Sequence, residues 1–484
     1  MIGQDHNTKK ISLLLLLIGA VAVFCALFWL LRTGKLFGPE TPKANWQTKE
    51  ITTDTGIQAT LKDKTLQLRV DGDTIFTSPQ GLLVQDFLFS DIDRDGRQEL
   101  LVLLWRVGRY GTAHPFWVTE EEDFYSQHLF IYNIKPDLTV KEKWCASDVG
   151  PEINRMKTME QDEATILTEA TDGECTLWRW DDWGMKSIDN KVKFVAFGDN
   201  IIHDEIRSIA DTQYDGTYDF LYEPFLDEIE SADIAAIQLE SVLVNKEELV
   251  SGFPSFGAPM AVGEAISDAG FDIAVCANNH ILDKGVDGIM ATTDFFAKKN
   301  ITTVGIQSPV DSVIRPYDIR YANGIKLALF SYTYGTNPGD SSISFPGMIH
   351  YLPADDDEEG KEELLQDMAK ARQEADIIIV FVHWGNEYET EVSDKQTAAA
   401  NLFAQGGADV VIGTHPHVVQ EMNVIPKPNG GDMIVFYSLG NFRAHQGQSP
   451  ETKSGAEAVL YIEHCYEGVR ITDYQMLELS SYVG

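Results

Sequence analysis

Residues 192–199 read VKFVAFGD, a mostly apolar run that ends in Gly198 and Asp199. Similar apolar runs recur at 234–239, 273–276, 325–330, 377–382, 410–412 and 433–437. Helix-like stretches lie between them, for example 262–269 and 361–374. The acidic run 355–359 suits the start of the second, because negative charge is favourable at a helix N-terminus. This alternation is typical of βαβ units around a buried sheet, so the sequence predicts an α/β domain over residues 191–480.

Polar residues with metal-binding chemistry follow these strands. Open α/β sheets bind ligands beyond the carboxyl ends of their strands, so side chains that follow separate strands are expected to meet at one rim. Six of the eleven histidines lie in or beside these segments. The strongest ligand candidates are Asp199, Glu240, Asn279, His383, His415 and His417.

The predicted rim suits divalent transition metals. Histidine nitrogen with carboxylate oxygen favours Zn, Mn or Fe, and two ions about 3.5–4 Å apart need a bridging carboxylate. His280 follows a candidate ligand and is predicted to be the general acid. His203 comes four residues after Asp199 and is either a further ligand or a helix-capping residue. A single buried histidine is usually a hydrogen-bonded core residue, but the clustering of several argues against that interpretation here.

These motifs together resemble the bacterial capsule-synthesis CapA family, also called the poly-γ-glutamate biosynthesis family, within the calcineurin-like metallophosphoesterase superfamily. The resemblance covers about residues 191–445. It is carried by Gly198-Asp199, Leu239-Glu240, residues 256–259, Ala277-Asn278-Asn279-His280 with Asp283, His383-Trp384-Gly385, residues 413–417 and residues 437–442. It implies a two-layer β core flanked by helices, metal roles for the six candidate ligands, and a catalytic imidazole at His280.

Residues 11–31 read ISLLLLLIGAVAVFCALFWLL and carry no formal charge. A helix of this length, about 31 Å, matches the hydrocarbon core of a bilayer. A cleaved signal peptide is the alternative, but its apolar region is shorter and ends in small residues. The sequence therefore predicts a short cytoplasmic tail over 1–10, a single anchor over 11–31, a linker over 32–50, and a cell-membrane protein whose bulk is extracytoplasmic.

Residues 51–188 alternate polar and apolar residues and contain Asp-Gly turns, which predicts a β-rich domain with room for two to four propeller-blade-like units. Asp91, Asp93, Asp95 and Glu99 occupy alternate positions of one short loop. Such a loop resembles the calcium loops of integrin-like propeller repeats; a solvated acidic turn is the alternative. Cys145 and Cys175 are predicted to form a disulfide, because an extracytoplasmic compartment can oxidise thiols.

The chain contains 38 basic and 75 acidic residues, for a formal net charge of −37. Such a chain repels polyphosphate backbones, which argues against nucleic acid as a partner. The expected partners are the membrane and other subunits of capsule or polyglutamate synthesis. The leading functional hypothesis is a CapA-type protein with a metal-dependent hydrolase or transferase site. A general extracytoplasmic metallophosphoesterase and a non-catalytic scaffold or export subunit are the alternatives.

Overall fold

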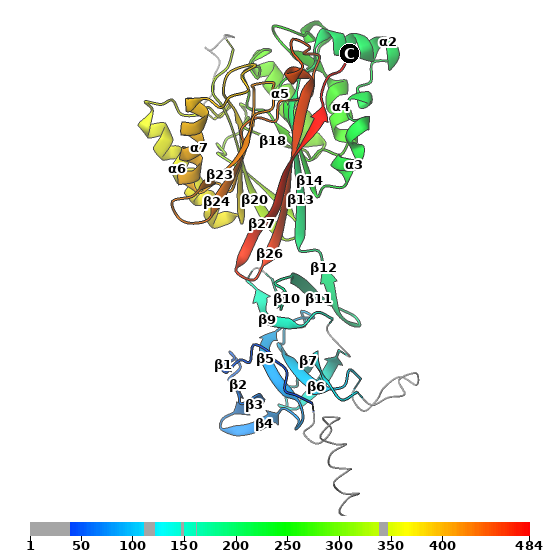
Figure 1. Ribbon diagram of the computed structural model, residues 1–484, viewed down its shortest axis with the longest axis vertical. Helices are drawn as coiled ribbons and strands as arrows, with labels where there is room; N and C mark the ends of the chain where they lie inside the picture. Colours follow the sequence, from blue (N-terminus) through cyan, green and yellow to red (C-terminus); the bar gives the residue numbers. More distant parts are fainter. Residues whose placement is uncertain (1–38, 111–121, 147–149, 161, 338–346) are drawn as a thin grey trace, which may run out of the picture. The chain divides into compact units, whose positions relative to one another are not determined.

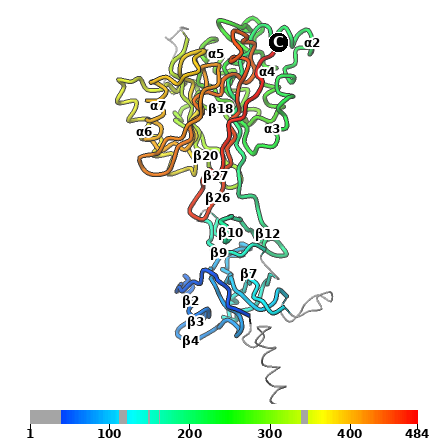
Figure 2. Tube along the Cα trace, viewed as in Figure 1, coloured from blue at the N-terminus to red at the C-terminus, as the bar shows by residue number. Residues whose placement is uncertain are grey.

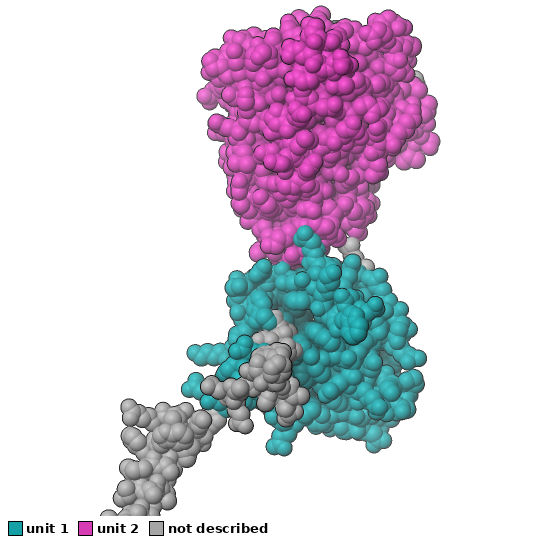
Figure 3. Space-filling model, turned by 90° about the vertical axis from the view of Figure 1, so that its right-hand side faces the viewer, with its two compact units in different colours: residues 1–189 teal, residues 190–484 magenta. Residues whose placement is uncertain are grey.

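The computed structural model describes residues 39–110, 122–146, 150–160, 162–337 and 347–484. The predicted anchor over residues 11–31 lies outside these ranges. None of the helices within them is long and apolar enough to cross a bilayer. The chain divides into two compact units, residues 1–189 and 190–484, which Figure 3 colours separately. Each unit is described by itself.

Within its described residues, unit 1 consists of three antiparallel sheets of four strands each, and the strands of each sheet are neighbours in chain order. The first sheet contains β1 (Lys49–Thr52), β2 (Gln58–Lys62), β3 (Thr65–Val70) and β4 (Asp73–Thr77). The second contains β5 (Leu83–Ser90), β6 (Glu99–Val107), β7 (Tyr125–Ile134) and β8 (Val140–Cys145). The third contains β9 (Ile153–Met159), β10 (Asp162–Ala170), β11 (Cys175–Asp181) and β12 (Gly184–Ile188). The predicted β-rich domain is therefore present; its likeness to a propeller stays a prediction.

The second sheet is buried on both faces. Leu100, Val102 and Leu104 of β6 pack with residues of the first sheet. Leu101 and Leu103 of the same strand pack with residues of the third. Successive side chains of a strand point to opposite faces. This arrangement explains why β6 is an unbroken apolar run where a half-exposed strand would alternate.

The acidic loop between β5 and β6 pairs with a lysine from β8. Asp91, Asp93 and Glu99 have carboxylate oxygens within 4.8 Å of one another, and Asp95 does not belong to this group. The Nζ atom of Lys143 on β8 donates to Glu99 at 3.0 Å and pairs with Asp93. The Asp91 carboxylate accepts the Asp95 and Gly96 amides. A lysine ammonium therefore already offsets the charge of two predicted calcium ligands, and calcium binding stays a prediction.

Lys143→Met is expected to destabilise the protein by about 3 kcal/mol, because it leaves the carboxylate of Glu99 buried without its partner. The side chains of Lys143 and Glu99 are only 11% and 4% exposed. Chemical denaturation of the full chain measures the loss, and Lys141→Met on the exposed face of β8 is the matched control. The same melts with and without millimolar calcium test the calcium prediction. Wild-type protein with an unchanged midpoint in calcium would contradict calcium binding, and equal stability of both variants would contradict the role of Lys143.

The predicted disulfide is wrong: the structure does not join Cys145 to Cys175. Cys145 is the last residue of β8 in the second sheet and is exposed, whereas Cys175 is the first residue of β11 in the third sheet and is buried. The two residues therefore belong to edge and inner strands of different sheets. A disulfide requires Cα atoms within about 7 Å, and spacing along the sequence gave no information on that distance.

Within the described part of unit 2 there are two large sheets and a small one. The strand order of the first large sheet is β18-β17-β14-β13-β26-β27, with β25 paired to β13; that of the second is β19-β20-β21-β22-β24-β23. The first contains β13 (Lys191–Asn200), β14 (Ile234–Leu239), β17 (Ile273–Val275), β18 (Thr302–Val304), β25 (Asn441–Arg443), β26 (Ser454–Cys465) and β27 (Gly468–Ser480). The second contains β19 (Asp318–Ala322), β20 (Ile325–Thr333), β21 (Ile377–His383), β22 (Val410–Thr414), β23 (Met422–Pro426) and β24 (Asp432–Phe436). β15 (Val242–Val244) and β16 (Gly257–Pro259) form the small sheet.

The two large sheets pack face to face with helices on both outer sides. Residues such as Phe194, Ile234, Leu327 and Phe381 fill the space between the sheets. Figures 1 and 2 show the helices α2 to α5 beside the first sheet and α6 and α7 beside the second. The helices are α2 (Asp204–Gln213), α3 (Leu226–Glu230), α4 (Met260–Asp268), α5 (Gly285–Lys298), α6 (Glu358–Glu374) and α7 (Asp394–Gly406). The mixed α/β fold is confirmed, and all seven predicted strands are present.

The segment 437–442 connects the two sheets at one end of the sandwich. The amide of Leu439 donates to the carbonyl of Gly413 in β22, and the amide of Asp199 donates to the carbonyl of Gly440. A Cβ atom at Gly198 would lie 2.0 Å from the Gly440 oxygen, and one at Gly413 would lie 2.1 Å from the Tyr437 oxygen. Only glycine permits these approaches, so this junction between the two sheets, which we call the seam, requires Gly198 and Gly413.

Candidate metal centre

Six candidate ligands meet at the seam end of the sandwich, three from each sheet. Asp199 lies near the end of β13, Glu240 directly follows β14, and Asn279 follows β17. His383 ends β21, and His415 and His417 follow β22. All six are at most 3% exposed. β13, β14 and β17 run parallel, as do β21 and β22, so their carboxyl ends deliver these side chains to one rim.

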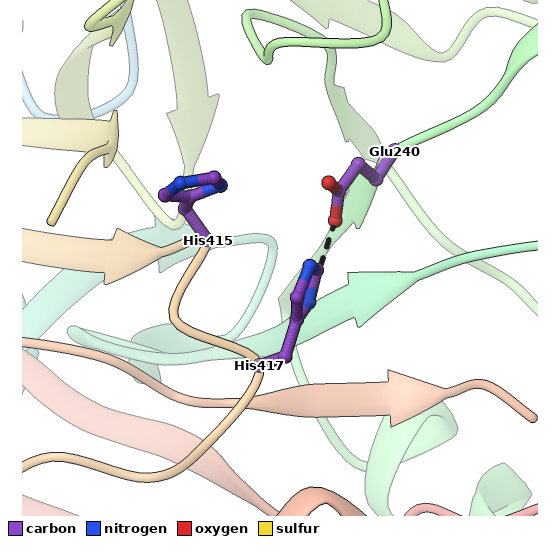
Figure 4. Close-up of side chains that lie close together, drawn as sticks. All are labelled: Glu240, His415 and His417. Atoms are coloured by element: carbon purple, nitrogen blue, oxygen red, sulfur yellow. Dashed lines mark ion pairs between the residues drawn. The ribbon is translucent and has the colours of Figure 1, made fainter. Parts of the chain in front are cut away.

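The donor atoms form two groups that share Glu240. Oxygen and nitrogen atoms of Glu240, His415 and His417 lie within 4.8 Å of one another, and so do those of Asp199, Glu240 and His383. The two carboxylate oxygens of Glu240 lie 3.5 Å from His383 Nε2 and 3.8 Å from His417 Nδ1. Figure 4 shows Glu240 opposite the two histidines of the β22 loop. A shared carboxylate between two donor sets is what a two-metal site requires.

Several donor atoms lack a hydrogen-bond partner among the described residues. They are Asp199 Oδ1, both carboxylate oxygens of Glu240, and His417 Nδ1. A buried polar atom without a partner costs about 1–3 kcal/mol, and more when it is charged. Carboxylate oxygens and imidazole nitrogens that converge in this way are the donor set that Zn, Mn and Fe prefer. The residues present therefore fit one or two divalent transition metals.

The other atoms of these ligands are held by the surrounding structure. Asn279 Oδ1 lies 2.9 Å from His383 Nε2, and His415 Nδ1 lies 3.1 Å from the same atom. His383 Nδ1 bonds Thr414 Oγ1 at 3.0 Å, and the His415 amide donates to Asp199 Oδ2 at 3.0 Å. Such partners orient the ligands and set the histidine tautomer.

The pKa values of the site follow from burial and charge. Burial lowers the pKa of His383 to about 3 and that of His415 to about 2, so both imidazoles are neutral, which is the form that binds metals. Burial alone would raise the pKa of Asp199, but the nearby His417 and His383 hold it below its usual range. Burial and then the charge of Asp199 raise the pKa of Glu240 well above its usual range. Burial opposes protonation of His417, but Glu240 and Asp199 raise its pKa to about 9.

The loop that carries two of the histidines is strained. His415 has a φ of 97° and His417 a φ of 58°, both in the left-handed region. Few residues other than glycine adopt this region, and such strain concentrates at functional sites. The strained backbone turns both side chains toward the rim although only one residue separates them. The histidine pair was predicted from the sequence, but the backbone conformation was not.

His280 does not belong to either donor group. Its Nδ1 atom bonds Asp283 Oδ2 at 2.7 Å, and the same oxygen accepts the Phe256 amide at 2.6 Å. Burial opposes protonation of His280, but the bond to Asp283 raises its pKa above the usual value. Asn337 Nδ2 lies 3.4 Å from His280 Nε2. A histidine beside the ligands, held by a carboxylate at one nitrogen, is the arrangement expected of a general acid.

His203 lies outside both donor groups as well. β13 continues to Asn200 and α2 begins at Asp204, so Asp199 and His203 are not separated by a turn of helix. His203 is the N-cap residue of α2 but its side chain makes no capping bond. Its Nδ1 atom instead accepts the His445 amide at 3.2 Å, and burial lowers its pKa to about 4. The structure thus places His203 at the N-cap position without a side-chain capping bond, and its role as a ligand stays a prediction.

Sequence reasoning missed the roles of several residues around the centre: Asp283, Asn337, Tyr334, Tyr388 and Thr414. Asp283 falls within the quoted Asn279-His280 motif, and its place three residues after His280 was the available signal. Tyr388 follows the His383-Trp384-Gly385 motif after β21, and its place in that motif was the available signal. Tyr334 and Asn337 follow β20, where nothing in the sequence pattern marks them.

Comparison with known proteins points to one family. A family model described as "Bacterial capsule synthesis protein PGA_cap" matches residues 193–446. The "PGA biosynthesis protein CapA" of Bacillus subtilis (strain 168) is 34% identical over 185 residues, which are 38% of this chain and 45% of that protein. The "Capsule biosynthesis protein CapA" of Bacillus anthracis is 32% identical over 198 residues, which are 40% of this chain and 44% of that protein. The matched regions thus span less than half of these relatives.

One similar solved structure is the calcineurin-like phosphoesterase YfkN from Bacillus subtilis. It is 17% identical, with a TM-score of 0.33 over 60% of this chain and 91% of that one. This score is too low to carry a conclusion. The layered β core and the donor set described above stand on their own geometry.

Proposed function

The chain belongs to the bacterial capsule synthesis protein family PGA_cap, and on this premise we propose that it serves in the synthesis or export of a capsule polymer such as poly-γ-glutamate. We further propose that the rim of unit 2 is a metal-dependent hydrolase or transferase centre. The observation that carries this second proposal is Glu240. It is fully buried, both of its carboxylate oxygens are without hydrogen-bond partners among the described residues, and imidazoles face it on two sides.

Each ligand in this proposal has a defined place. Glu240 would be shared by two donor groups, with His415 and His417 in one and Asp199 and His383 in the other. Asn279, whose Oδ1 atom lies 2.9 Å from His383 Nε2, would add a donor beside His383. Divalent ions bound there would polarise a phosphoryl or carbonyl oxygen and offset developing negative charge. Asn279 contributes a neutral oxygen, which limits the negative charge that the ions must balance. Thr414 fixes the His383 ring through its second nitrogen.

His280 would handle the proton of the reaction. With Nδ1 bound to Asp283, its Nε2 atom is the one placed to give a proton to the leaving group. Asp283 orients the ring and favours the protonated form. Asn337 Nδ2 lies 3.2 Å from Nδ1 and 3.4 Å from Nε2 and would help to hold the ring in place.

The test is the metal content and activity of the full chain. Protein from metal-replete expression is expected to carry one or two transition-metal ions per chain and to hydrolyse p-nitrophenyl phosphate or a phosphodiester. A chelator should abolish turnover, and Mn or Zn should restore it. Wild-type protein that binds no transition metal would overturn the enzymatic proposal and favour a scaffold or export subunit. Protein that binds metal but hydrolyses no phosphoester would exclude phosphoesterase activity.

We also propose a membrane location, with residues 11–31 as anchor and the bulk outside. Its support is the uncharged apolar segment and the similarity to the PGA and capsule biosynthesis proteins of two Bacillus species. Protease added to intact, wall-stripped cells should digest both units. Full protection of the units would reverse this topology.

A further inference from the structure

Two tyrosines form walls beside the metal centre. The ring centroid of Tyr334 lies 4.7 Å from that of His415, and the Tyr388 ring lies 5.9 Å from that of His417. Tyr334 is 49% exposed and Tyr388 is 47% exposed. Each ring therefore has one part against a candidate ligand and another part open to solvent, where a bound molecule can contact it.

The backbone holds both tyrosines in place. The Tyr334 amide donates to the His383 carbonyl at 3.0 Å, and the Tyr388 amide donates to the Pro416 carbonyl at 2.8 Å. Tyr388 has a φ of 65°, in the left-handed region that a bulky residue rarely adopts. Each tyrosine is thus tied to a loop that carries ligands, and the strain at Tyr388 is of the kind found at binding sites.

A groove of about 1130 Å³ begins at Tyr334 and extends along α7. At the metal end it is lined by Tyr334, Trp384, Gly385 and Asn386, and further along by the 352–358 loop and one side of α7. This volume exceeds the usual range of about 300–1,000 Å³ for small-molecule pockets. A substrate whose reacting group lies at the rim therefore has room for a large substituent beyond Tyr334.

The lining of the groove suits a neutral group with many hydroxyls. It offers amide and hydroxyl side chains, namely Asn386, Ser393, Asn401 and Gln405. The charged residues that line the described groove are four carboxylates and two lysines. One of the lysines, Lys361, already donates to Glu358 at 2.7 Å. Carboxylates disfavour a polyanion such as polyglutamate. An exposed ring beside hydrogen-bonding side chains suits the apolar face and the hydroxyls of a sugar.

We propose that the substrate of the metal centre is a phosphoester of a sugar or polyol. Its hydroxyl-rich substituent would contact Tyr334 at the start of the groove and Tyr388, which lies outside the groove beside His417. This inference rests on the proposed metal-dependent hydrolysis and narrows it. In the reaction, the oxygen of water forms a bond to phosphorus and the bond from phosphorus to the leaving oxygen breaks. The leaving oxygen takes a proton from His280, and a proton from the water restores His280. A role in polymer assembly does not require the polymer itself to be the substrate.

The test compares phosphodiesters that share p-nitrophenol as leaving group. The second substituent is methyl, a maltosyl group, or an oligo-γ-glutamyl chain. Wild-type full-length protein is expected to prefer the maltosyl ester over the methyl ester by about tenfold in kcat/KM, mainly through KM, as one stacking contact provides. Tyr334→Ala and Tyr388→Ala should each reduce this preference toward unity, and Tyr334→Phe should keep it. Tyr321→Ala, at an exposed tyrosine on β19, should leave all rates unchanged.

The outcomes separate this inference from the function on which it rests. If metal-loaded wild type cleaves none of the esters, the proposed hydrolysis fails. If it cleaves the methyl and maltosyl esters equally, or prefers the γ-glutamyl ester, hydrolysis stands and the sugar or polyol substrate is excluded. If Tyr334→Ala slows all the esters alike and loses metal, the tyrosine only supports His415 and the inference is overturned.

Discussion

Replacing His415 is expected to remove metal from the protein and to lower any metal-dependent turnover by more than about 100-fold, beyond the 10- to 100-fold typical of residues that merely orient ligands. His415 supplies a nitrogen to the group with Glu240 and His417, and its neutral imidazole cannot be replaced by a side chain without a donor. Metal content by elemental analysis and turnover are the measurements.

The left-handed backbone at His415 requires two variants. His415→Ala removes the imidazole but also places alanine at a φ of 97°. His415→Gly removes the imidazole with a residue that adopts this conformation without strain. Both variants should lose metal, whereas His445→Ala, outside both donor groups, should retain it. Retention of metal and activity in folded His415→Gly would exclude His415 as a ligand.

His280→Ala is expected to keep its metal and to lose about 10²- to 10⁴-fold in kcat, the usual contribution of a general acid. The loss should be larger for an alkyl phosphoester, whose leaving oxygen needs a proton, than for a p-nitrophenyl ester, whose phenolate leaves unaided. A merely structural role would slow both esters alike. Equal losses with both leaving groups would therefore contradict proton donation by His280.

Asp283→Asn tests how His280 is held. The amide side chain retains an oxygen for the Phe256 amide, which Asp283 accepts at 2.6 Å, but it removes the negative charge beside the imidazole. The alkyl ester should slow by less than it does in His280→Ala, with metal content unchanged. A larger loss than that of His280→Ala would show that Asp283 acts in another way.

The candidate ligands could be predicted because the direction of the strands largely determines where the residues that follow them lie. Residues that follow parallel strands meet at one end of a sheet, so Asp199, Glu240 and Asn279 could be placed together from their positions alone. The sequence did not predict the division of the strands between two sheets or the left-handed backbone at His415 and His417. Both depend on packing between segments that are distant in the sequence.

The contacts that the sequence did not show have equally local causes. The four residues from Asp199 to His203 do not form a helical turn, because β13 extends to Asn200 before α2 begins. The acidic loop was read without its partner Lys143, which lies 44 residues after Glu99 on another strand. In each case the missing information was a tertiary contact, which the local sequence pattern does not show.

Gly198 and Gly413 allow the two sheets to approach closely at the seam, because neither residue has a side chain. The three candidate ligands from each sheet are fixed to that sheet. The distance between the two sets of ligands therefore depends on how closely the sheets approach at the seam. A single methyl group at either glycine would meet a carbonyl oxygen at 2.0 or 2.1 Å, where real Cβ atoms stay beyond 3.0 Å. Metal coordination tolerates errors of only about 0.2 Å. The alignment of the two donor sets thus depends on two residues that supply no ligand atom.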